Sequence, residues 1–490
     1  IGLSSWTEGL KDILVIRADF PDLTGEPVTP TGATMNAAFL TNKISNEVGP
    51  FYDEASYGKT ALSLSAANVT PVLRMPTAAQ TYAANDSLTQ LRIDALAAAE
   101  TAGYDTGSYD RIYLVFTHIG PSRYSNSQFT WAGVGLIGGS FMWINGYFDL
   151  RVAGHEMGHT YGLRHANLWQ IPGGSSNPVD LGGSSTEYGD WFDMMGDGPS
   201  SASTQPDYFN PWFMNRLDWM ANQSIQTVTT GGTYRLFRYD HRNANQSNTL
   251  ALKIARDGTR DYWIGYRRKY FGHSTHSDAG NAAYLIWGYQ TNEVSNLIDV
   301  DTPGTNQLDA CLNVGNTFHD NAAGIHVTTT ASGGSGTDQW LDVTVAFDSR
   351  IQFSSTSVDV DEQSGNATVT LIRTGDTTSL VNVSYATANG TATAPADYST
   401  TNGNAIWLPG DSSPKTITVP IVADALAEGT ETFTVNLTGI SGGIFVDGTT
   451  ATVRIVEPGV VDPSFVHPYF NFSGSVRDFA VQPDGKIAFV

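Results

Sequence analysis

The stretch GHEMGHTYGLRH, Gly154–His165, places three histidines, a glutamate and two internal glycines within twelve residues. Asp149 precedes it and is a residue type that caps the N-termini of helices. Gly162 suits the end of a helix because glycine adopts positive φ without strain. The sequence therefore predicts a helix between Asp149 and Gly162. In such a helix His155 and His159 lie one turn apart on the same face.

This spacing of histidines is typical of a metal site. Two imidazoles at positions i and i+4 can both reach one zinc ion, and His165 can return to it after the turn at Gly162. We therefore expect His155, His159 and His165 as zinc ligands, with the open fourth position of a catalytic site. Glu156 lies about 100° around the helix from His155. It would act as the general base and pass the proton to a leaving amine. The alternative is a helix whose histidines are incidental.

The pattern HExxHxxGxxH resembles that of the metzincin clan of zinc peptidases. That resemblance implies a tight turn with a methionine beneath the zinc, and YGDWFDMMGDG at Tyr188–Gly198 lies downstream. It is similar to the turn of the gametolysin-like peptidases, in which Met precedes Gly. Met195 is therefore the first choice and Met194 the second, with core filling as the alternative role. Some clan members have a tyrosine ligand two residues after the methionine. Asp197 occupies that position here, so we expect no fifth ligand.

Other segments resemble the same group and the related immune-inhibitor-A-like secreted proteases. These segments are LVIRADFPD at 14–22, FYDEASYGK at 51–59, NVTPVLRMP at 68–76 and DACLNVGNTFHDNAAGIHV at 309–327. The resemblance covers about residues 1–347. It implies an α/β (α+β) metzincin-like catalytic domain followed by a β-sandwich, and a secreted endopeptidase that acts on proteins or peptides.

A substrate of such an enzyme would pair with an edge strand above the zinc, main chain to main chain. TWAGVGLIGG at Thr130–Gly139 is the candidate, because Gly133 and Gly135 would let a peptide approach closely. The alternative is a plain connection between strands. Tyr188 is a candidate donor of a hydrogen bond to the oxyanion, with aromatic packing as its alternative role.

The order of expected elements divides the chain, which at 490 residues is too long for one hydrophobic core. Buried strands at 11–22 and 109–120 alternate with a helix at 87–103, which predicts an α/β catalytic domain over residues 1–222. Residues 223–348 show short alternating strands with Gly-rich turns and no convincing helix, which predicts a β-sandwich.

Residues 349–457 resemble a Calx-β domain, which is a second all-β sandwich. Matching pieces are VSYATANGTATAPADY at 383–398 and EGTETFTVNLT at 428–438. In calcium-binding members, acidic residues at one end of the sandwich share Ca²⁺ ions, and oxygen ligands from separate loops suit that cation. The matching positions here are Glu362, Asp397, Asp424, Glu428 and Glu431. The acidic pair expected after the last strand is reduced to Glu457, so solvated loop carboxylates are the alternative.

Residues 458–490 are predicted to hold a linker and a truncated β repeat. PGVVDPS at 458–464 has the composition of a linker, and VRDFAVQPDGKIAFV at 476–490 resembles the start of a delta-60-type repeat. Such repeats occur in tandem in large bacterial surface and secreted proteins, which implies that the natural protein is longer. The absence of an initial Met before Ile1 indicates a processed chain.

Charge and composition limit the partners. The net charge of −22 disfavours nucleic acid and anionic membranes as partners, and no run of about 18 apolar residues predicts a membrane span. Cys311 is the single cysteine, so no intrachain disulfide can form, which fits a bacterial exported protein better than a disulfide-rich animal one. We expect a secreted or cell-surface bacterial protein that acts as a monomer.

Three functions compete. The first is a secreted zinc endopeptidase, which rests on the histidines, Glu156 and the methionine turn together. The second is a surface adhesion or matrix protein with an inactive or latent peptidase domain, which rests on the two C-terminal segments. The third, hydrolysis of a non-peptide substrate, has only the zinc motif in its favour. The intact Glu156 favours the first, because an inactive relative would most often have lost the base or a ligand.

Overall fold

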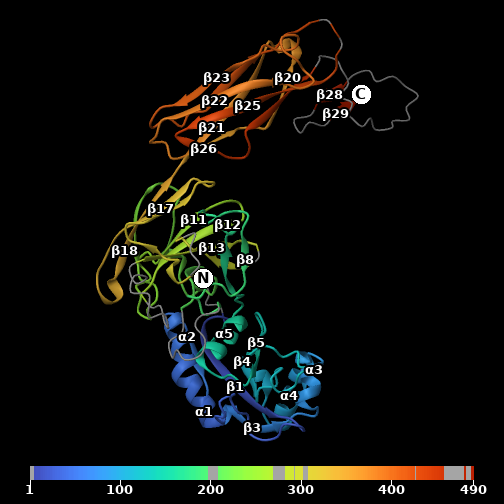
Figure 1. Ribbon diagram of the computed structural model, residues 1–490, viewed down its shortest axis with the longest axis vertical. Helices are drawn as coiled ribbons and strands as arrows, with labels where there is room; N and C mark the ends of the chain where they lie inside the picture. The colour runs from blue at the N-terminus through green and yellow to red at the C-terminus, as the bar shows by residue number, and fades with distance from the viewer. Residues whose placement is uncertain are drawn as a thin grey trace, which may run out of the picture. The chain divides into compact units, whose positions relative to one another are not determined.

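The computed structural model describes residues 5–196, 208–268, 282–291, 293–301, 307–424, 426, 428–456, 479–481 and 487–489 (Figure 1). The chain divides into two compact units, Ile1–Asp348 and Ser349–Val490. No helix in the described part of the chain is both long and apolar enough to cross a membrane.

The first unit opens with a six-stranded, mostly parallel sheet. Its strand order is β2-β1-β4-β6-β5, with β3 paired to β1 beside β2, and only β5 runs antiparallel to its neighbour. The strands are β1 (Gly9–Asp19), β2 (Thr60–Ser63), β3 (Val69–Arg74), β4 (Arg111–Phe116), β5 (Gly133–Gly135) and β6 (Phe141–Asn145). The predicted strands at 11–22 and 109–120 are thereby confirmed.

Helices cover both faces of this sheet (Figure 1). Ile13 and Val15 of β1 pack with α1, α2 and α5, whereas Leu14 and Ile16 pack with α3 and α4. A strand buried on both faces needs a continuous apolar run, which is why ILVI at 13–16 shows no alternation. The helices are α1 (Ala37–Lys43), a π-helical turn (Ile44–Val48), α2 (Gly49–Ala55), α3 (Ala79–Ala84), α4 (Leu88–Thr101), α5 (Leu150–Thr160) and α6 (Pro211–Arg216). Among the described residues, no α-helix follows α6.

Two further sheets complete the first unit. An eight-stranded sheet has the order β8-β7-β14-β13-β12-β11-β9 with β15 paired to β13, and a four-stranded sheet has the order β10-β18-β17-β16. The strands of the larger sheet are β7 (Ala166–Gln170), β8 (Ser184–Thr186), β9 (Ile225–Thr227), β11 (Ala251–Ala255), β12 (Arg260–Tyr266), β13 (Ala282–Tyr289), β14 (Ser295–Leu297) and β15 (Leu312–Asn313). Those of the smaller sheet are β10 (Gly232–Phe237), β16 (Thr317–Asp320), β17 (Ile325–Gly333) and β18 (Trp340–Phe347).

The eight-stranded sheet is buried on both faces. Along β13, Tyr284 and Ile286 pack with the helices and loops of the α/β region, whereas Leu285 and Trp287 pack against the four-stranded sheet. The predicted boundary between residues 222 and 223 lies inside this compact unit. Strands β7 and β8 precede the boundary and join the sheet formed by strands that follow it. The boundary therefore marks a change of secondary structure within one unit, and the two regions share a core.

The second unit is a β-sandwich, as predicted. One sheet has the order β24-β21-β19-β26 and the other β20-β27-β25-β22-β23, and their inner faces form one apolar core. In β25, buried Phe433, Val435 and Leu437 alternate with more exposed residues, which is typical of a strand with one face on the core. The strands are β19 (Ser349–Phe353), β20 (Ser357–Asp361), β21 (Asn366–Gly375), β22 (Val381–Asn389), β23 (Asn402–Trp407), β24 (Lys415–Pro420), β25 (Glu431–Ser441), β26 (Gly443–Phe445) and β27 (Thr450–Val456).

The predicted linker and repeat at 458–490 lie largely outside the described residues. The described part is an antiparallel pair of short strands, β28 (Phe479–Val481) and β29 (Ile487–Phe489). The assignment to a delta-60-type repeat stays a prediction.

Candidate active site

Helix α5 carries the histidine motif in the predicted position. The Asp149 side chain accepts a hydrogen bond from the backbone N–H of Val152 at 2.8 Å, which caps the helix. Every residue from Ala153 to Thr160 is buried. Gly162 follows with φ 104°, in the left-handed region where a side chain would be strained. This turn redirects the chain, so that the residues after it can approach the helix again.

The three predicted ligands lie together. One ring nitrogen from each of His155, His159 and His165 falls within 4.8 Å of the others. The Nε2 atoms of His159 and His165 are 3.1 Å apart. His155 and His159 are 8% and 6% exposed, and His165 is half-buried. The donor set, three imidazoles that face one point, fits zinc.

A hydrogen bond fixes the tautomer of each histidine. An acceptor faces every Nδ1, so the proton lies on Nδ1 and leaves Nε2 as a lone-pair donor for a metal. Burial lowers the pKa of all three rings, that of His159 to about 4, which keeps them neutral. The acceptors are the Met194 carbonyl for His155 at 2.9 Å, the Leu163 carbonyl for His159 at 2.8 Å and Glu187 Oε1 for His165 at 2.6 Å.

The carboxylate of Glu156 lies between α5 and β5. The side chain is 6% exposed, and burial raises its pKa to about 8, against the opposing effect of a hydrogen bond from the Gly135 N–H. A Cβ on Gly133 would come within 2.6 Å of Glu156 Oε1. The carboxylate is thus held at the floor of the site by the edge strand.

The predicted edge strand forms, although it is shorter than the segment 130–139. Strand β5 covers three residues and lies at the edge of its sheet, paired to β6. A Cβ on Gly135 would lie 2.9 Å from the Cβ of His159 and closer still to the Glu156 carbonyl oxygen. The space that the two glycines leave is therefore filled by α5. The structure gives these glycines a packing reason that the sequence did not show.

The methionine-bearing turn packs beneath α5. Met194 and Met195 are both fully buried. Met194 lies against Gly154, where a Cβ would come within 3.1 Å of its methyl carbon, and the sulfur of Met195 lies against Gly158. Both predicted candidates thus touch the motif helix. Asp197, the position considered for a fifth ligand, lies outside the described residues.

Tyr188 lies beside the histidines. Its ring centroid is 3.7 Å from that of His165 and 5.8 Å from that of His155. The residue has φ 61° and is 38% exposed, and its N–H donates to Asn167 Oδ1 at 3.2 Å. This position agrees with ring packing and leaves the role of oxyanion donor a prediction.

A cleft of about 760 Å³ opens onto His155 and Glu156. Its walls come from α1, α5, the loop before β5 and the segment around Thr29–Ala33, so it is built entirely within the first unit. Several aromatic side chains contribute to the lining. The aromatic residues are Phe39, Trp131, Tyr147, Phe148 and Tyr188.

Sequence reasoning missed Glu187, which contacts His165 from 22 residues away. It also missed two tyrosines that hold α5 from other elements. Tyr52 donates to the Gly154 carbonyl at 2.6 Å, and Tyr113 donates to the Ala153 carbonyl at 2.8 Å. No local pattern marks any of these three residues, because each contact joins segments far apart in the chain.

In the second unit the structure groups three of the five predicted acidic residues. Carboxylate oxygens of Asp397, Glu428 and Glu431 lie within 4.8 Å of one another. Glu362 is not in that group, and it accepts a hydrogen bond from the backbone N–H of Asp424 at 3.2 Å.

Two family models match the chain. Residues 12–214 match gametolysin peptidase M11, and residues 347–459 match the Calx-beta domain. Sodium/calcium exchanger 1 of Rattus norvegicus is 32% identical over 119 residues, which is 24% of this chain and 11% of that protein. The exchanger of Canis lupus familiaris is 37% identical over 93 residues, 19% of this chain and 10% of that one. The chain thus spans about a tenth of the length of these curated relatives.

Solved structures match shares of the chain that differ widely in size. The apo form of the Calx CBD1 domain is 28% identical with a TM-score of 0.22, and the match covers 22% of this chain and 97% of that one. Wild-type OgpA from Akkermansia muciniphila is 11% identical with a TM-score of 0.28, covering 93% of each chain. From the two family models, this chain carries a metallopeptidase domain of the gametolysin family followed by a Calx-beta domain.

Proposed function

We propose that this protein is a secreted, zinc-dependent endopeptidase of the metzincin type. One observation carries the proposal: three imidazole nitrogens lie within 4.8 Å of one another at a cleft whose floor also holds Glu156. His155, His159 and His165 would hold the zinc, and the match to a metallopeptidase family supports this assignment. The resemblance to secreted bacterial proteases supports action outside the cell, and we take the protein to act as a monomer.

The chain's own residues would divide the reaction between them. Bound zinc would supply a Lewis acid that polarises the scissile carbonyl and lowers the pKa of water. Glu156 would take the proton of the attacking water and deliver it to the leaving amine. The Gly135 N–H and the burial between α5 and β5 would hold that carboxylate in place. The aromatic walls of the cleft would exclude bulk water around the peptide.

A surface adhesion or matrix protein with an inactive peptidase domain is the alternative. The Calx-beta domain is compatible with either function. The placement of Glu156 beside the three histidines favours the enzyme, because the base and all three ligands are present in one geometry. Met195 beneath the helix and β5 at the cleft agree with a peptidase more than with another hydrolase.

Cleavage of casein tests the proposal. The full chain is compared with Glu156→Gln, which keeps the shape of the buried side chain, and with His159→Ala. General-base loss should lower kcat by about 10²–10⁴-fold while one zinc per chain stays bound. His159→Ala should lose the zinc, and a chelator should stop the unmutated chain. If Glu156→Gln cleaved casein as fast as the unmutated chain, the role of Glu156 as general base would be contradicted. If the unmutated chain binds zinc but does not cleave casein, the result would favour the adhesion alternative.

We also propose that Asp397, Glu428 and Glu431 bind Ca²⁺ in the Calx-beta domain. Three carboxylates this close repel one another, and a hard cation would offset that repulsion. Titration of the full chain with Ca²⁺ should raise the melting temperature. At 100 times the dissociation constant the stabilisation is about 2.7 kcal/mol. The double variant Asp397→Asn, Glu431→Gln should abolish the effect, whereas the control Asp424→Asn should keep most of it. An equal response in both would refute the site.

A further inference from the structure

A cluster of polar side chains lies buried behind the methionine turn. It joins two carboxylates and one guanidinium in a region without solvent contact. Its members are Asp190, Asp193, Asn210, Arg267, Tyr284 and Ser295, each 0% exposed. Below they are called the Asp190 cluster. Burying charge costs free energy, and apolar residues of similar volume are often at least as stabilising. The cluster therefore needs a reason other than stability alone.

The first half of the cluster fixes the start of the turn. The hydroxyl of Tyr284 donates to Asp190 Oδ2, and the backbone N–H of Phe192 donates to Asp190 Oδ1 at 3.1 Å. The guanidinium of Arg267 lies 4.5 Å from the centroid of the Tyr284 ring. Burial raises the pKa of Asp190, and the charge of Arg267 opposes that shift. A residue of the eight-stranded sheet, Tyr284 of β13, therefore holds Asp190 in place.

The second half fixes the end of the turn. Asp193 accepts hydrogen bonds from the Met195 N–H at 2.8 Å and from the backbone and side-chain nitrogens of Asn210 at 2.6 and 2.8 Å. Asn210 also caps α6 and donates to Ser295 Oγ of β14 at 3.1 Å. The turn is therefore tied to α6 and to a second strand of the eight-stranded sheet.

The turn held in this way contacts one proposed ligand, His155, and the residue that follows another, His165. The Met194 carbonyl accepts the Nδ1–H of His155 at 2.9 Å. Ala166, which follows His165 directly, donates its N–H to the Met195 carbonyl at 2.9 Å and accepts from the N–H of Asp190 at 3.2 Å. A shift of the turn would therefore rotate the ring of His155 and move the backbone that carries His165.

Three members of the cluster lie beyond residue 214, where the match to the peptidase family ends. We propose that Arg267, Tyr284 and Ser295 are positioning residues for the metal site, so that the β-rich region after residue 222 is part of the catalytic apparatus. This inference rests on the proposed function. It accounts for the shared core of the two regions and for buried charge at their junction.

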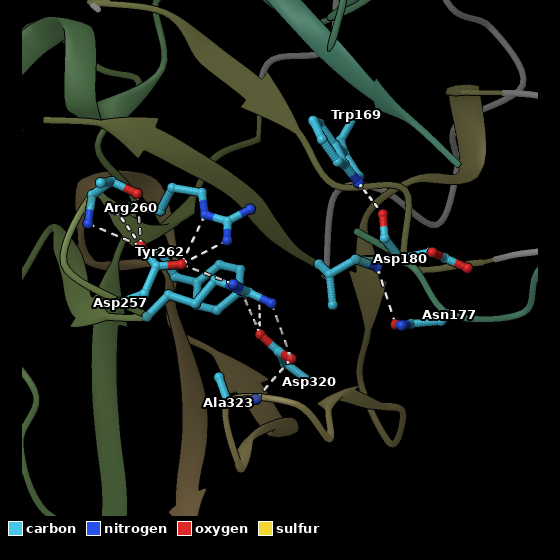
Figure 2. A network of polar contacts seen from close by, with 11 residues as sticks. Trp169, Asn177, Asp180, Asp257, Arg260, Tyr262, Asp320 and Ala323 are labelled. Carbon is cyan, nitrogen blue, oxygen red and sulfur yellow. Dashed lines mark hydrogen bonds and ion pairs between the residues drawn. The ribbon is translucent and has the colours of Figure 1, made fainter. Parts of the chain in front are cut away.

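Tyr284→Phe is the test, because it removes one hydroxyl and leaves the ring. The same sheet offers a matched control on its other face, Tyr262→Phe. There the Tyr262 hydroxyl donates to buried Asp320 at 2.7 Å, and Arg256 pairs with the same carboxylate at 2.7 Å (Figure 2). That network joins the eight-stranded sheet to β16 of the four-stranded sheet, in a core other than the one that packs around α5. Both variants remove one buried tyrosine–aspartate hydrogen bond next to an arginine.

Zinc affinity of the full chain is measured with Zn²⁺ in competition with a chromophoric chelator. A group hydrogen-bonded directly to a metal ligand is worth about 10- to 100-fold in metal affinity, and Tyr284 acts on the ligands through the turn. Tyr284→Phe should therefore weaken zinc binding by the lower end of that range, about tenfold. Tyr262→Phe should keep the wild-type affinity, although both variants lower the melting temperature. The visible absorption of the Co²⁺-loaded protein should change in Tyr284→Phe alone. In casein cleavage, Tyr284→Phe should lower kcat with little change in KM.

Equal zinc affinities and equal Co²⁺ spectra in the two variants would overturn the inference. If the wild type binds zinc and cleaves casein in that case, the proposed function stands and the positioning role alone falls. If the wild type binds no zinc, the proposed function and this inference fall together. A chain that binds zinc without cleaving casein still decides the positioning role through affinity and spectrum.

Discussion

The substitution Gly135→Ala should damage catalysis through a clash between β5 and α5. A Cβ at this position would lie 2.9 Å from the Cβ of His159, and ordinary contact begins at 3.4 Å. The Glu156 carbonyl oxygen is closer still, and neither group lies at the end of a flexible chain. The edge strand must therefore move away from the helix by about 0.5 Å or more. Overpacking of this kind lowers the free energy of unfolding by about 1–3 kcal/mol.

The retreat would also move the Gly135 N–H that holds the Glu156 carboxylate. A displacement of about 1 Å at a catalytic group costs about 10²-fold in rate, so a smaller shift should cost about 10- to 100-fold in kcat/KM. Zinc should stay bound, because all three histidines lie on α5 and the segment after it. Gly133→Ala should lower activity with a smaller loss of stability, since the three atoms nearest to its new methyl group all belong to the Glu156 side chain and none to the backbone.

Casein cleavage, zinc content and thermal unfolding measure the three effects together. Gly173→Ala is the control, because a Cβ there meets no heavy atom within 4 Å and it should behave as the wild type. Wild-type stability and kcat in Gly135→Ala would refute the packing argument. A rise in KM alone would instead show that the glycine serves the approach of the peptide, as the sequence first suggested.

Two further predictions concern single carboxylates. Glu187→Ala removes the carboxylate that accepts the Nδ1–H of His165 and should weaken zinc about tenfold in a chelator competition; unchanged affinity would show that the ring needs no outer partner. Asp19 has a lowered pKa because its hydrogen bonds from Arg74 and the Gly25 N–H outweigh the effect of burial. Its contribution of about 1 kcal/mol is present above the unfolded pKa and is lost as pH falls through the lower, folded pKa. The stability gap between wild type and Asp19→Asn should therefore close in acid, and a gap independent of pH would contradict the ion pair.

The local features of the site could be predicted from the sequence. The cap at Asp149, the helix after it and the turn at Gly162 depend on residues within a few positions of one another, as does the i, i+4 spacing of His155 and His159. The β-sandwich of the second unit could be predicted for the same reason. Alternation along a strand shows directly which face is buried.

The sharing of strands across residue 222 could not be predicted. Strands β7 and β8 join a sheet whose other members lie up to about residue 313, and backbone hydrogen bonds between strands do not depend on side-chain identity. A change in composition marks where the secondary structure changes. It does not mark where a compact unit ends, and here the unit continues to Asp348.

The sequence by itself determined the candidate groups of the site: three imidazoles, a carboxylate and a methionine turn, with a glycine-rich edge strand expected near them. Only the tertiary structure decided what holds them. The contact of Tyr284 with Asp190 joins residues 94 positions apart, and Glu187 reaches His165 from another loop. Gly135 packs against α5, a neighbour that its own segment does not reveal. Ligand spacing is a property of one helix, whereas the support of that helix depends on distant segments that meet when the core forms.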